Sequence, residues 1–140
     1  MMKPKISPQE YQKTLKNLEL KVIYLSGLTV NLNEEIDAKQ LQIEIKEKSS
    51  FQIKDKTLKN SYQYKFFAKN KEAKESFLTV SCEYTVLYSM SEDTEISKEF
   101  YEIFTNFVLN MTVWPYFREL ISNVISRVNM PPLVLPMKKL

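Results

Sequence analysis

The stretch that most limits what this chain can fold into is MTVWPYFRELISNVISRV, from Met111 to Val128. Thr112 can cap a helix, because its hydroxyl can accept from the amides of the first turn, and Pro115 within that turn needs no N–H. The apolar side chains that follow recur at the helical period, in a stripe too wide for one sheet to cover; they are Val113, Trp114, Phe117, Leu120, Ile121, Val124, Ile125 and Val128. The pattern predicts a helix that starts near Val113 and packs on two sides.

A proline-rich tail follows this helix. Asn129 is a C-terminal stop signal, and Pro131 and Pro132 prevent the helix from continuing. We therefore expect residues 131–136 to run extended across the surface or the sheet.

Four alternating segments upstream predict a sheet. In the first, Gly27 is the only glycine of the chain and indicates a bulge or a close backbone approach. Its even-numbered apolar residues are expected to share one face: Leu20, Val22, Tyr24, Leu28, Val30 and Leu32. The expected strands are Leu18 to Leu32, Gln40 to Ile53, Tyr62 to Ala68 and Leu78 to Met90, with a polar turn from Asp55 to Ser61 and a hairpin turn from Asn70 to Lys74.

An apolar periodicity from Phe100 to Met111 predicts a further helix, capped by Thr94 or Ser97 after an acidic turn. Strands followed by helices, without alternation, indicate an α+β fold with an antiparallel sheet covered on one face. The 140 residues, 44% of them hydrophobic, fit one domain spanning 1–140. Residues 10–18 fit either a helical turn or the start of a strand.

The composition disfavours catalysis. The chain has no histidine, the commonest general base and zinc ligand. Adjacent acids such as Glu34 and Glu35, or Glu92 and Asp93, are expected to be solvated. We therefore expect no enzyme activity, no cofactor and no metal site.

The single cysteine, Cys82, excludes a disulfide framework and fits a buried core position in a reduced, cytoplasmic protein. The N-terminus lacks the apolar run of a secretory signal, and no segment reaches 18 apolar residues. We expect no membrane insertion.

Charge is unevenly distributed around a net value of +3. Residues 46–74 hold nine lysines against three acids, with Tyr62, Tyr64, Phe66 and Phe67 interleaved, which could form a basic platform for single-stranded nucleic acid. Because the rings fall mainly on the buried parity, a half-solvated hairpin is the favoured interpretation, with no nucleic acid bound. A nucleic-acid-binding module remains the alternative of a different class.

The segment WPYFRELISNVISRVNMPPLVLP resembles the signature of the SecB family of protein-export chaperones: aromatic-P-Y-x-R-E, then S-R, then P-x-L-x-L-x-P. The residues that match are Trp114, Pro115, Tyr116, Arg118, Glu119, Ser126, Arg127, Pro132, Leu133, Leu135 and Pro136. The resemblance implies a four-stranded antiparallel Greek-key sheet followed by two helices packed on one face.

The resemblance also implies a function. SecB-like proteins are ATP-independent holdases that bind unfolded or nascent polypeptides in an apolar groove, for export or handover, as homotetramers built as dimers of dimers. Family members are typically acidic and bind the SecA translocase motor, and a further helix follows the proline motif. This chain is net basic and stops at Leu140, so we expect no such lid over the groove. A SecB-like chaperone dedicated to a toxin–antitoxin system, with one antitoxin as client, is therefore kept as an alternative.

The location of the groove in the family suggests a set of client contacts: Ile36, Leu41, Ile43, Trp114, Phe117, Met130, Leu133 and Leu135. The surplus apolar width of the helix suggests an oligomer interface formed by Trp114, Arg118, Ile121 and Ile125. Arg118 and Glu119 are expected either to form salt bridges at an interface or a sheet edge or to contact a client directly.

Overall fold

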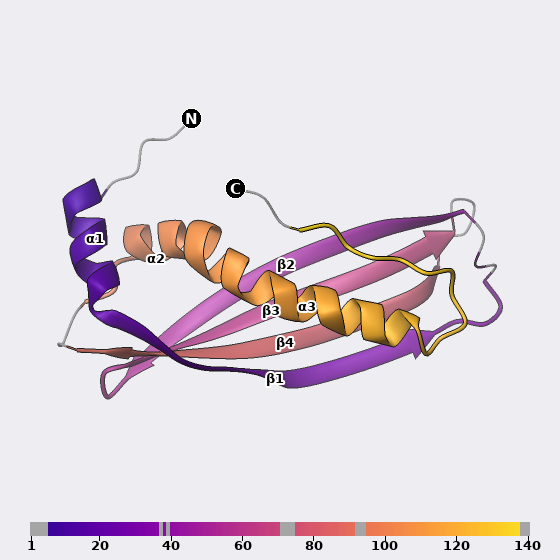
Figure 1. Cartoon of the computed structure of the whole chain (residues 1–140), viewed down its shortest axis with the longest axis horizontal. Helices are drawn as coiled ribbons and strands as arrows, with labels where there is room; N and C mark the ends of the chain where they lie inside the picture. The colour runs from indigo at the N-terminus through magenta and orange to yellow at the C-terminus, as the bar shows by residue number, and fades with distance from the viewer. Residues whose placement is uncertain (1–5, 37, 39, 71–74, 92–94, 138–140) are drawn as a thin grey trace.

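The computed structural model describes residues 6–36, 38, 40–70, 75–91 and 95–137. Its four strands form one antiparallel sheet in the order β1-β4-β3-β2, a Greek key in which β1 returns beside β4. The long helix and the C-terminal tail lie on one face of this sheet (Figure 1). The predicted α+β architecture is confirmed. The elements are α1 (Pro8–Lys16), β1 (Leu18–Leu32), β2 (Leu41–Lys54), β3 (Thr57–Asn70), β4 (Ser76–Met90), α2 (Lys98–Phe104), the π-helical segment η1 (Thr105–Leu109) and α3 (Asn110–Ile125).

The segment before β1, which the sequence left open, is the helix α1. The Ser7 hydroxyl accepts from the Glu10 amide at 3.2 Å, and Pro8 occupies the first helical turn. Tyr11 faces the core, where its ring centroid lies 5.0 Å from that of Phe100.

A two-residue turn connects β2 and β3. Asp55 and Lys56 both have positive φ, 50° and 58°, as the tight hairpin turn that matches strand twist requires. The predicted polar turn from Asp55 to Ser61 is therefore wrong, because β3 already begins at Thr57. The predicted turn at 70–74 lies largely outside the described residues, as does Thr94.

Two bulges interrupt the pairing of β1 with β4. The register shifts between Leu20 and Val22 and again between Leu25 and Gly27. Each extra residue reverses the side-chain alternation, so Val22 and Tyr24 lie on the face opposite the one predicted for them. The bulge expected near Gly27 is confirmed, but the backbone approach there is ordinary, since a Cβ on Gly27 would lie 3.7 Å from the Glu83 Cβ.

The two predicted helices form one continuous helical segment, in which η1 joins α2 to α3. The Ser97 hydroxyl caps α2 by accepting from the Phe100 amide at 3.0 Å, as predicted. The start expected near Val113 is wrong, because Thr112 lies inside α3 and its hydroxyl donates to the Val108 carbonyl at 2.8 Å. Asn129, the predicted C-terminal stop, has a left-handed conformation with φ of 48°, and α3 itself already ends at Ile125.

The core lies between the helical segment and strands β3 and β4. Tyr64 stacks on Phe117 with a centroid distance of 4.0 Å and an interplanar angle of 9°. Tyr62 and Phe66 are also buried on this face, so these three rings are not available to stack on nucleic-acid bases. Cys82 is buried beside them, and this burial raises the pKa of its thiol to about 12. No helix within the described residues is both long and apolar enough to cross a membrane.

Candidate functional site

The C-terminal tail covers the second side of α3. The Trp114 Nε1–H donates to the Pro136 carbonyl at 2.9 Å, and the Arg118 Nε–H donates to the Leu135 carbonyl at 2.6 Å. Leu135 is buried against the core. The two-sided packing predicted for this helix is therefore present, but the second side is occupied by the chain's own tail.

The tail and the core cover the residues of the predicted oligomer interface, which stays a prediction. Trp114, Ile121 and Ile125 are 8%, 1% and 3% exposed, so a second subunit cannot reach them in this conformation. Arg118 is bonded to the tail, and the described residues contain no ion pair between it and Glu119. The helical segment instead exposes Phe107 and Tyr116.

The predicted client contacts divide into two groups. Trp114, Phe117 and Leu135 are buried core residues in this conformation, so their contact with a client stays a prediction. The other five are half-buried apolar side chains at the edge of the core. Figure 1 shows that the β1–β2 connection, the start of β2 and the turn that leaves α3 lie at the same end of the sheet. We call these five residues the end cluster: Ile36, Leu41, Ile43, Met130 and Leu133.

A second apolar surface, which the sequence did not reveal as exposed, lies along β1. The pairing register places seven apolar residues of β1 on the helix side of the sheet, and five of them are 38–46% exposed. They are exposed because α3 lies over β3 and β4 and the tail lies on the β2 side of α3, so β1 is left uncovered (Figure 1). We call them the β1 strip: Leu20, Leu25, Leu28, Val30 and Leu32.

The two edge strands of the sheet differ in their protection. β2 carries the lysines 46, 48 and 54, which discourage other strands from pairing with it. β1 carries a single lysine, Lys21, which is paired with Glu19 at 3.1 Å. Within the described part of the chain, the outer edge of β1 pairs with no other strand. A 15-residue strand with an apolar face and free backbone groups is suited to take up another chain.

Comparison with known proteins identifies the fold. No protein-family model matches the chain, and no curated protein sequence matches it. A SecB-like chaperone of Mycobacterium tuberculosis, solved in complex with a ChAD peptide from the HigA1 antitoxin, superposes with a TM-score of 0.81 and 14% identity, covering 93% of this chain and 97% of that one. A protein of unknown function from Streptococcus agalactiae reaches a TM-score of 0.44 at 13% identity, with 85% and 96% covered. The chain has the fold of a SecB-like chaperone.

Proposed function

We propose that this protein is an ATP-independent chaperone that holds unfolded polypeptides, with an antitoxin as its client. The observation that carries the proposal is the exposed apolar surface of the end cluster and the β1 strip, on a fold shared with a chaperone that was solved with an antitoxin peptide. Weak apolar contacts tolerate many client sequences, and Met130 adds an adaptable side chain. Holding a client requires no catalytic group.

The end cluster is the proposed client site. Its five side chains are half-buried, so each is ordered against the core and still accessible. The tail supplies Leu133 to this surface and is fixed to α3 by the bonds to Trp114 and Arg118. A client in extended form can therefore lie across it without the core opening.

The β1 strip is the proposed self-association site. An antiparallel strand is self-complementary about a twofold axis, so two β1 edges can pair with each other and bring the two strips side by side. Complete burial of the exposed 40% of each side chain would contribute about 1 kcal/mol, so about 10 kcal/mol is the upper limit for two strips before the cost of association. Phe107 and Tyr116 on the helical segment offer a further contact for a dimer of dimers.

Two double variants separate these roles. Met130→Ser with Leu133→Ser should leave the oligomer intact and abolish the suppression of client aggregation. Leu28→Ser with Val30→Ser should yield a smaller species in sedimentation velocity, and it loses only partly buried surface. A wild-type protein that neither associates nor suppresses aggregation would refute both assignments.

The same proposal covers localisation and client class. A lone buried thiol fits the cytoplasm. An export role would add unfolded preproteins as clients and SecA as a partner, and titration with SecA tests it. Tight binding of an antitoxin peptide without binding of SecA supports the toxin–antitoxin role.

A further inference from the structure

The face of the sheet that points away from the helix holds an open trough of about 470 Å³. Two rows of side chains cross all four strands and line it. One row runs Thr29, Ser81, Lys65, Lys46, and the next runs Gly27, Glu83, Gln63, Lys48. The polar and charged side chains of these rows point away from both apolar sites, because neighbouring residues along a strand alternate between the two faces. Leu28 of the β1 strip also borders the trough.

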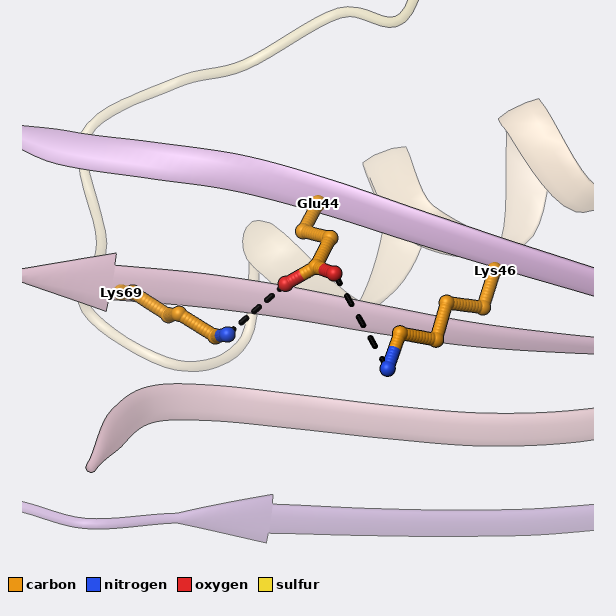
Figure 2. A network of polar contacts seen from close by, with 3 residues as sticks. All are labelled: Glu44, Lys46 and Lys69. Carbon is orange, nitrogen blue, oxygen red and sulfur yellow. Dashed lines mark hydrogen bonds and ion pairs between the residues drawn. The ribbon is translucent and has the colours of Figure 1, made fainter. Parts of the chain in front are cut away.

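The trough has an excess of positive charge. On the face that contains it, β2 and β3 place six lysines, at positions 46, 48, 54, 59, 65 and 69, and the acids beside them are Glu44 and Glu83. Glu44 is shared between two lysines, 2.7 Å from the Lys69 Nζ and 3.9 Å from the Lys46 Nζ (Figure 2). The hydrogen bond from Lys69, together with its charge, lowers the pKa of Glu44. Among the described residues, Lys48 and Lys65 have no carboxylate within ion-pair distance.

One pairing in the trough has no structural benefit to the fold. Lys46 on β2 lies directly opposite Lys65 on β3. Like charges at directly opposed positions destabilise a sheet. Protection of the β2 edge accounts for Lys46 and Lys48, but it does not account for Lys65, which is on an inner strand. The pair becomes favourable when an anion lies between or above the two ammonium groups.

We propose that this basic trough binds an extended acidic segment of a partner protein. Alternate side chains of an extended peptide recur about every 6.8 Å, which is also the spacing between Lys46 and Lys48 along β2. A peptide lying along β2 and β3 can therefore direct successive carboxylates at Lys46, Lys48 and Lys65.

The chemistry of the trough favours carboxylates over nucleic acid. Its cations are all lysines, without the guanidinium forks that recognise phosphate groups in pairs. Phe67 on this face lies under Lys46 and Lys69, with the two Nζ atoms 5.6 and 5.2 Å from the ring centroid, so Tyr24 on β1 is the exposed ring left on this face of the described strands.

Fluorescence anisotropy with a labelled ten-residue glutamate-rich peptide tests the proposal. Lys46→Gln with Lys65→Gln should weaken binding by about fivefold to thirtyfold, the loss expected for two exposed charge contacts. The matched control is Lys13→Gln with Lys16→Gln, which removes the same charge from the exposed face of α1 and should leave the affinity within about twofold. The sheet variant should also unfold at the same or a higher temperature, since it removes a like-charge pair.

Three results would overturn the proposal: no binding of the peptide by the wild type, an equal loss in the α1 control, or tighter binding of a single-stranded oligonucleotide of equal charge. The Met130→Ser, Leu133→Ser variant should still bind the acidic peptide. The trough and the proposed chaperone function can therefore fail independently.

Discussion

The tail should behave as a single latch whose two hydrogen bonds depend on each other. The test is a double-mutant cycle of Trp114→Phe, which keeps an aromatic ring but removes the donor to Pro136, and Arg118→Met, which keeps the stem but removes the donor to Leu135. If the tail detaches as one unit, either substitution alone releases it. The other substitution then lowers the free energy of unfolding by little more.

The magnitude follows from the contacts. Burial of Leu135 and half-burial of Leu133 contribute about 3 kcal/mol, the Trp114 bond about 1 and the charged Arg118 bond about 2. Ordering residues 133–137 costs about 6 kcal/mol at slightly more than 1 per residue. The favourable contacts and the cost of ordering the tail therefore cancel to within a few kcal/mol, so the loss of either hydrogen bond is enough to release the tail.

Urea unfolding followed by circular dichroism should show a coupling energy of about 1 kcal/mol between the two substitutions. The control is Arg127→Met, which removes an exposed bond to Asn123 on the same helix, and it should be additive with Trp114→Phe. Additivity within about 0.3 kcal/mol for Trp114 and Arg118 would show that the tail bonds act independently.

Three further measurements test the core and the helix start. Cys82 should react with a thiol reagent far more slowly in the folded protein than in urea, since burial raises its pKa to about 12; rapid native labelling would place this face of β4 in solvent. Burial also raises the pKa of Tyr62, Tyr64 and Tyr84, so the unfolded state loses these protons first. The contribution of these tyrosines to the free energy of unfolding is therefore complete below about pH 10, and above that pH it falls by about 1.4 kcal/mol per pH unit for each ring. Urea midpoints that stay constant from pH 8 to 11 would contradict this expectation. Ser97→Ala should lower stability by about 1 kcal/mol in the same urea assay, because the Phe100 amide loses its cap; an unchanged midpoint would mean that the cap does not contribute.

The alternation of apolar residues was sufficient to predict the buried faces of the strands that have a neighbouring strand on both sides. The even positions of β4 from Leu78 to Met90 face the core as predicted, because β4 lies between two strands and beneath the helix. Tyr62, Tyr64 and Phe66 follow the same rule on β3. For these strands the local pattern and the tertiary environment agree.

The positions that sequence reasoning missed depend on long-range packing. The apolar width of α3 was correctly taken to mean a second contact, but nothing in the pattern distinguishes a partner subunit from the chain's own tail. The bulges at Lys21 and Ser26 left no sequence signal apart from Gly27, although the Thr85 hydroxyl, which donates to the Ser26 hydroxyl at 2.9 Å, helps to hold the second one.

The contrast between the two sheet edges links the fold to its proposed use. The apolar residues of β1 are typical of a strand in the core. The strand order shows that β1 is instead an edge strand of the sheet. Lysines could have protected β1 as they protect β2, but apart from Lys21 the lysines of the described strands lie on β2 and β3 and on the opposite face. That distribution keeps the apolar edge of β1 free of cationic repulsion and concentrates positive charge in the trough. The same sheet thus offers apolar surface on one face and an anion-binding surface on the other, and substitutions in one should leave the other unaffected.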